Sequence, residues 1–158
     1  YRADVVQDNY EDFNDKFYGN GNVMVSNKSA LHGTHVSGII GAARGNAKGM
    51  DGVADNVRIM TLRAVPDGDE HDKDIALAIR YAVDNGAQVI NMSFGKSFSP
   101  EKKWVDEAVK YAESKGSLRF FPNSSTKLAW VSIMRSTIGP EDTYLLSVFT
   151  FREKKKKI

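Results

Sequence analysis

The sequence predicts an α/β fold in which a parallel sheet is flanked by helices. Between residues 33 and 116, helix-like and strand-like segments alternate, and each helix-like segment carries apolar residues at helical spacing. Alternation of this kind favours parallel strands joined by right-handed crossovers. The chain has 158 residues, of which 41% are hydrophobic, so it is long enough for one domain, or a piece of one, with a buried core.

The first helix is expected at residues 33–43, where Val36, Ile39 and Ile40 recur at helical spacing. The stretch "VRIMTLRAV" at 57–65 alternates in polarity and is rich enough in β-branched residues to predict a strand.

The second helix is expected at 74–85, and Gly86 supplies its C-terminal stop. "AQVINMSFG" at 87–95 is a short apolar run, typical of a strand that is buried on both faces. A third helix is expected from Ser99, a residue suited to an N-cap, to Gly116. The acidic stretch "DGDEHDKD" at 67–74 is expected to be a solvated turn with helix N-terminal charges.

The composition changes at both ends of this alternating region. Residues 1–31 are polar and lack a period, which predicts a long surface loop. Residues 1–116 carry a net charge of −3, whereas residues 117–158 carry a net charge of +5. Half of the positive side chains in 117–158 belong to the run "KKKK" near the end of the chain. In this tail, "LAWVSIM" and "YLLSVFTF" could be short strands, but the α/β pattern is lost.

Bulk composition excludes several classes of function. With no cysteine, the chain cannot hold a disulfide framework, a thiolate zinc site or a cysteine nucleophile. No apolar run reaches the roughly 18 residues of a membrane helix, and no signal peptide opens the chain. Since the first residue is Tyr rather than Met, we expect a processed form, an excised piece or a fragment.

His32 and His35 stand three residues apart in "SALHGTHVSGIIGAARG". At this spacing both could reach one metal ion, although carboxylates would then have to complete a zinc site. Both could instead pack and hydrogen-bond at a helix start. A third interpretation is that one is the base of a catalytic site, which the adjacent small residue Gly33 would suit by allowing close backbone approach.

The stretch "HGTHVSGIIGA" resembles the histidine box of the subtilisin-like serine proteases (the subtilases). About sixty residues later, "INMSFG" resembles a second motif of that family, in its substrate-binding strand. Two motifs in the right order are far more specific than one. The resemblance covers roughly 30–116 and implies part of a three-layer, subtilisin-like fold that is truncated. It divides the chain into a loop or insertion (1–31), a partial catalytic domain (32–116) and a frame-shifted or disordered tail unlike the family (117–158).

The resemblance assigns roles to individual residues. It implies that His32 is the general base, which takes the proton of a serine nucleophile, and that His35 is structural. At a helix start, His32 is expected to be exposed, with His35 deeper in the packing. Ser93, Phe94 and Gly95 would offer backbone groups to an extended substrate, and Gly95 would keep the first specificity pocket open.

The rest of the machinery is not found. By the family's spacing, the catalytic Asp falls at or before residue 1 and the serine beyond the end of the chain. Asp4, Asp8, Asp12 and Asp15 lack the sequence context of the catalytic Asp. Asn123 lies near the position expected for an oxyanion-binding Asn, but Pro122 precedes it where the family has glycine, and it is not assigned.

The resemblance therefore implies a serine endopeptidase that hydrolyses peptide bonds through an Asp/His/Ser triad, of which this chain carries only the His and part of the cleft. A peptide or protein substrate is the expected partner, with neither nucleic acid nor a membrane, and an extracytoplasmic location, secreted or periplasmic. No metal or cofactor is expected at the site; the family allows calcium, but no calcium site can be mapped.

Two alternatives remain open. The chain could be an inactive fragment, a pseudoenzyme or a peptide-binding domain that uses the cleft strand. The lysine tail could also bind nucleic acid, in which case binding to DNA would depend on salt.

Overall fold

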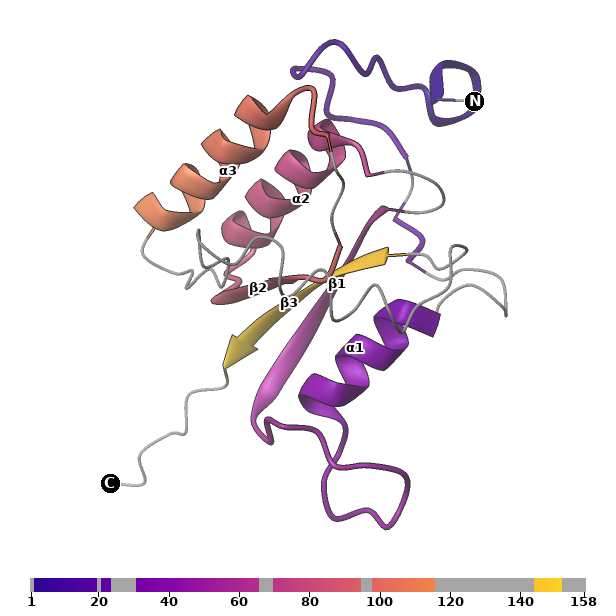
Figure 1. Ribbon diagram of the computed structural model, residues 1–158, viewed down its shortest axis with the longest axis vertical. Coiled ribbons are helices and arrows are strands. Elements are labelled where there is room, and N and C mark those ends of the chain that lie inside the picture. The colour runs from indigo at the N-terminus through magenta and orange to yellow at the C-terminus, as the bar shows by residue number, and fades with distance from the viewer. Residues whose placement is uncertain are drawn as a thin grey trace.

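Three helices and three strands follow one another in the computed structural model, which describes residues 2–19, 21–23, 31–65, 70–94, 98–115 and 144–151. A short π-helical turn precedes them near the N-terminus (Figure 1). In chain order the elements are η1 (Arg2–Val6), α1 (Leu31–Gly41), β1 (Val57–Val65), α2 (Asp72–Asp84), β2 (Val89–Met92), α3 (Lys102–Ser114) and β3 (Tyr144–Phe151).

The alternation of helices and strands confirms the α/β prediction between residues 31 and 114. β1 has the expected bounds, whereas α2 begins two residues earlier than expected and β2 is shorter than the apolar run that predicted it. Gly86 ends α2 as expected, because its φ of +81° lies in the left-handed region that glycine adopts without strain. The expected end of α3 at Gly116 lies outside the described residues.

The sheet has the order β1-β3-β2, and β3 runs antiparallel to both neighbours. Val148 of β3 lies opposite Met60 of β1 on one side and opposite Ile90 of β2 on the other. Because β1 and β2 each run opposite to β3, they are parallel to one another, as expected for strands joined through α2.

The expected sheet was parallel throughout, and the pairing in the described strands differs from it. The middle position is taken by "YLLSVFTF" of the tail, one of the two stretches that we expected to be short strands. The other stretch, "LAWVSIM", lies outside the described residues. The alternation pattern could not indicate how a strand from outside the alternating region enters the sheet.

The sheet lies between α1 on one side and the α2–α3 pair on the other (Figure 1). The buried core is formed mainly by α2, its flanking strands and α3. Its best-buried members on α2 are Ala76, Ile79 and Ala82, and on α3 Ala108 and Ala112. Burial of these small and branched side chains in register allows the two helices to pack closely.

The outer end of the α2–α3 contact is polar. The Tyr111 hydroxyl of α3 donates a hydrogen bond of 2.6 Å to Asp84 of α2, and Arg80 stacks on the Tyr111 ring at 4.9 Å. The hydrogen bond to Asp84 is the main reason why the pKa of the Tyr111 phenol is raised, with loss of hydration and the negative charge of Asp84 adding to it.

The loop after α1 folds back onto the end of that helix. The backbone N–H groups of Gly52, Val53 and Ala54 donate to the carbonyls of Ala42, Ile39 and Ile40, which satisfies acceptors that a helix end leaves unpaired. A Cβ atom at position 52 would lie 2.3 Å from the backbone nitrogen of Ala42, so this close approach requires glycine.

Candidate functional site

His32 is the second residue of α1, and only 3% of it is exposed. It lies one helical turn before Val36, which is also buried, so these residues form the inner face of the helix. His35 is exposed together with Leu31 and Ile39, which lie one turn before and after it. The expectation that His32 is exposed and His35 is packed was therefore wrong.

The reason for this reversal lies in α1 itself. Its apolar residues occupy both faces, because Leu31 and Ile39 are exposed whereas Val36 is buried. Periodicity could not show which face rests on the sheet. The different burial of the two histidines also disfavours a metal ion shared between them, and the residues that the structure describes contain no group of three or more metal-ligating side chains.

Ser93 and Phe94 directly follow β2, at its carboxyl end. The Ser93 hydroxyl accepts a hydrogen bond of 2.8 Å from the Asn91 side chain, and Phe94 packs against the edge of the core. Gly95, the third residue predicted to bind substrate, lies outside the described residues. Sites of α/β proteins lie at the carboxyl ends of the strands, and the segment after β2 has this position.

The first turn of α2 also begins beyond the carboxyl end of a strand, β1. Asp72, 2% exposed, accepts a hydrogen bond of 2.6 Å from the Ser99 hydroxyl and one of 2.9 Å from the Glu101 backbone N–H. The expectation that Ser99 caps α3 was wrong: the helix begins at Lys102, and the Ser99 hydroxyl donates to Asp72 instead.

Lys73 is fully buried. Its ammonium group donates to the carboxylate of Asp8 and, at 2.6 Å, to the carbonyl of Asn9, and it lies 4.7 Å from the centre of the Tyr18 ring. Asp8 is buried as well, so the two charges compensate each other away from water.

The adjacent Asp74 accepts a hydrogen bond of 2.5 Å from the Tyr18 hydroxyl. Asp72 and Lys73, from the stretch expected to be a solvated turn, are therefore buried contacts, and that expectation was wrong for both. Local sequence could not show this, because their partners lie 27 or more residues away.

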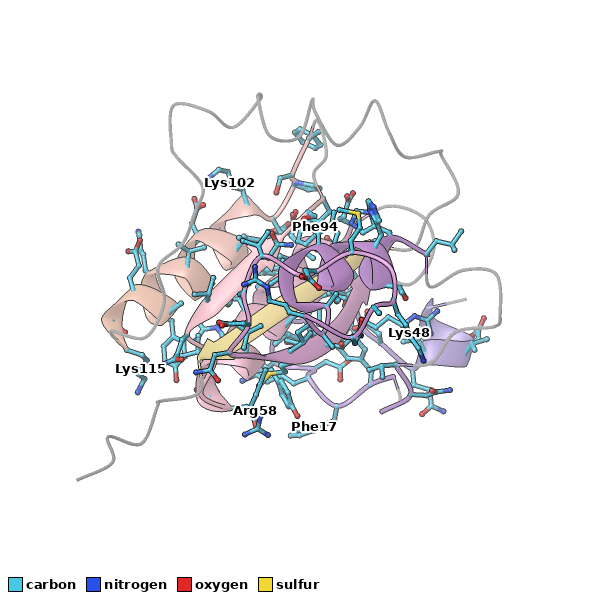
Figure 2. All side chains as sticks on the ribbon, turned by 90° about the horizontal axis from the view of Figure 1, so that it is seen from below. Phe17, Lys48, Arg58, Phe94, Lys102 and Lys115 are labelled. Carbon is cyan, nitrogen blue, oxygen red and sulfur yellow. The ribbon has the colours of Figure 1, made fainter. Side chains whose placement is uncertain are left out.

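Aromatic side chains continue the contact between the N-terminal segment and the helices. Phe13 stacks on Trp104 of α3 with ring centres 5.2 Å apart, and Tyr10 makes edge contacts with Trp104 and His71. We expected this segment to be a polar surface loop. Its several aromatic residues were the available signal that part of it packs on the domain, whereas Phe17 projects from the rim of the molecule and is 97% exposed (Figure 2).

Three of the four carboxylates considered as partners of His32 accept hydrogen bonds from other groups. Asp8 pairs with Lys73, Asp12 accepts the Asn14 backbone N–H at 2.8 Å, and Asp15 accepts the Asn9 backbone N–H at 2.7 Å. Asn123 and the serines that follow it lie outside the described residues.

An open cavity of about 630 Å³ lies along the N-terminal segment rather than beside the predicted site residues. It is lined by Ala3, Gln7, Asp8, Asn9, Tyr10, Glu11 and Asp15. No described helix is both long and apolar enough to cross a membrane.

Comparison with known proteins identifies relatives of the chain. The model of the subtilase family (Peptidase_S8) matches residues 3–128, which extends beyond both motifs. A thermophilic serine proteinase of Bacillus sp. (strain AK1) is 47% identical over 88 residues, which is 55% of this chain and 21% of the relative. Thermitase of Thermoactinomyces vulgaris is 35% identical over 119 residues, covering 72% of this chain and 42% of the relative.

A cell wall-associated protease of Bacillus subtilis (strain 168) is 36% identical over 88 residues, 55% of this chain and 10% of the relative. The chain thus spans less than half the length of each of these relatives. No solved structure gives a significant match. Because the family model covers most of the chain, and the two motifs that indicated the family lie within the matched range, the chain belongs to the subtilase family.

Proposed function

We propose that this chain is part of the catalytic domain of a subtilisin-like serine endopeptidase, which hydrolyses peptide bonds through an Asp/His/Ser triad. The observation that carries the proposal is the family match over residues 3–128, together with relatives named as serine proteases. In this proposal His32 is the general base, and Ser93, Phe94 and Gly95 bind an extended substrate strand.

The chemistry requires a serine hydroxyl within hydrogen-bond reach of a neutral imidazole, which removes the proton as the oxygen attacks the carbonyl carbon and returns it to the leaving amine. By the family's spacing, the serine and the aspartate that orients His32 belong to parts of the protein beyond this chain.

For the longer protein, we propose a parallel sheet flanked by helices. The support is that β1 and β2 run in the same direction and are joined through α2, the connection of a parallel βαβ unit. We also propose an extracytoplasmic location and a polypeptide substrate. No cofactor is proposed for the reaction, and calcium, which the family allows, is assigned no site.

Labelling by a fluorophosphonate probe tests the assignment of the nucleophile to another part of the protein. The chain should remain unlabelled, whereas a longer product of the same gene should react, and His32→Ala in that product should lower kcat by orders of magnitude. Covalent labelling of the present chain would contradict the proposal.

The second candidate function is a peptide-binding domain without catalysis, which the position of Ser93 and Phe94 after β2 favours. Fluorescein-labelled casein, an unstructured protein, serves as the probe. Binding to the chain, measured by fluorescence anisotropy and weakened by Gly95→Val, would support this function. If Gly95→Val leaves casein binding unchanged, the binding site lies elsewhere in the chain.

A further inference from the structure

The segment after β2 is fixed at two points. At one end, β2 pairs with β3 through Met92. At the other end, Ser99 and Glu101 are hydrogen-bonded to Asp72 of α2. Only six residues separate Met92 from Ser99, and Ser93 and Phe94 directly follow the first of these two anchors.

The two bonds to Asp72 also fix the start of α3. Its N-cap residue, Glu101, makes no capping bond with its own side chain. The carboxylate of Asp72, which lies on α2, accepts the backbone N–H of Glu101 and so satisfies one of the N–H groups that the start of α3 leaves unpaired. Its negative charge is favourable there, since it lies in the first turn of α2 and beside the N-terminus of α3.

We propose that Asp72 is a positioning residue for the peptide-binding strand, which it holds in place through Ser99 and Glu101. This inference rests on the proposed role of Ser93 and Phe94 in binding an extended polypeptide. Asp72 touches no substrate; it acts by holding the far end of the segment whose near end is the cleft strand.

Asp74 supplies a matched control. It has the same chemistry, lies in the same helical turn and also accepts a hydrogen bond from a hydroxyl group. The hydroxyl is that of Tyr18, which belongs to the N-terminal segment. Loss of charge or of helix capping in α2 would affect Asp72→Ala and Asp74→Ala alike, whereas loss of positioning affects only Asp72→Ala.

The experiment uses the full chain and two measurements. Amide hydrogen exchange over residues 93–104 reports the order of the segment, and the anisotropy of fluorescein-labelled casein reports binding. Asp72→Ala should increase exchange at Glu101 about tenfold and weaken casein binding about tenfold. Changes of this size are expected from the loss of one to two charge-assisted hydrogen bonds. Asp74→Ala should leave both within about twofold, because the bond to Tyr18 that it removes lies outside this segment.

Asp72→Asn should keep most of the protection from exchange and most of the casein binding. An amide keeps an oxygen that accepts the Glu101 N–H, and its NH2 group can donate to the Ser99 oxygen. A role of the charge alone would not be rescued in this way. If Asp72→Ala does not fold, Ser99→Ala serves instead, because it removes one of the two hydrogen bonds to Asp72. Ser99→Ala should then increase exchange and weaken casein binding, whereas Ser99→Thr, which keeps a hydroxyl group, should change both much less.

The outcomes separate the inference from the proposed function. If the unaltered chain does not bind casein, peptide binding by this chain is refuted, and hydrogen exchange still decides whether Asp72 orders the segment. If exchange at 93–104 is the same in Asp72→Ala and Asp74→Ala, the positioning role is refuted. Unchanged casein binding in Asp72→Ala, with binding by the unaltered chain present, also overturns it.

Discussion

Lys73→Met tests whether the N-terminal segment is held by a buried ion pair. The side chains of Lys73 and Asp8 are both fully buried, so the substitution leaves the Asp8 carboxylate without its cation, away from water. Removal of one partner from a buried pair costs about 3–5 kcal/mol. The Asn9 carbonyl loses a donor as well. The free energy of unfolding of a domain is typically about 5–15 kcal/mol, so the substitution removes a large share of the stability.

The measurement is urea-induced unfolding followed by circular dichroism, for the full chain at neutral pH. Asp8→Leu combined with Lys73→Met removes both charges, and the double variant should recover to within about 2 kcal/mol of the original chain, because an apolar pair of similar size is often tolerated. Lys102→Met is the control: Lys102 is more than half exposed on the outer side of α3, where Figure 2 shows it, and it pairs with Asp106 one turn away.

The control should change the free energy of unfolding by less than about 0.5 kcal/mol, the value of an exposed pair at this spacing. If Lys73→Met lowers the free energy of unfolding by less than about 1 kcal/mol, the buried pair does not anchor the segment, because the loss of the cation from a desolvated carboxylate is strongly destabilising.

Gly52→Ala should destabilise the chain by about 1–3 kcal/mol in urea unfolding, because the new Cβ would overlap a backbone nitrogen at 2.3 Å, whereas Gly38→Ala, with no atom within 4 Å, should stabilise α1 by up to about 1 kcal/mol. If the two substitutions changed the free energy of unfolding equally, the close approach of Gly52 to Ala42 would be excluded. The Tyr111 phenol should keep its proton above pH 10, measured by its absorbance near 295 nm against Tyr111→Phe, because its pKa is raised in the folded chain only. Since the unfolded chain releases this proton first, the contribution to stability is present below about pH 10 and is lost as pH rises through the folded pKa; titration at the ordinary pKa would contradict the contact. In this cysteine-free chain, Thr61→Cys with Ser147→Cys should form a disulfide on mild oxidation, because the two residues are opposite in the sheet. Failure to cross-link, with free thiols that remain reactive, would argue against β3 as the central strand.

The elements formed by local sequence were largely predictable. The alternating polarity of residues 57–65 predicted β1 with its observed bounds, and Gly86 was correctly expected to end α2. Both features depend on neighbours in the chain: the side-chain period of a strand and the φ angle that glycine adopts without strain. The two family motifs likewise required only short stretches of sequence.

Features that depend on distant partners could not be predicted in the same way. Lys73 and Asp72 looked like members of a solvated acidic turn, and only the tertiary structure shows that each is buried against a segment 27 or more residues away. The prediction that His35 rather than His32 is buried was wrong, because α1 has apolar residues on both faces. Which face lies on the sheet depends on the packing of the whole domain.

The sequence by itself thus determined the order of helices and strands, the family and the residues proposed to bind substrate. The tertiary structure alone decided that β3 occupies the middle of the sheet and that the first turn of α2 joins the N-terminal segment to the start of α3. Secondary structure follows from contacts a few residues apart, whereas strand order and buried charge pairs arise from contacts between segments that only folding brings together.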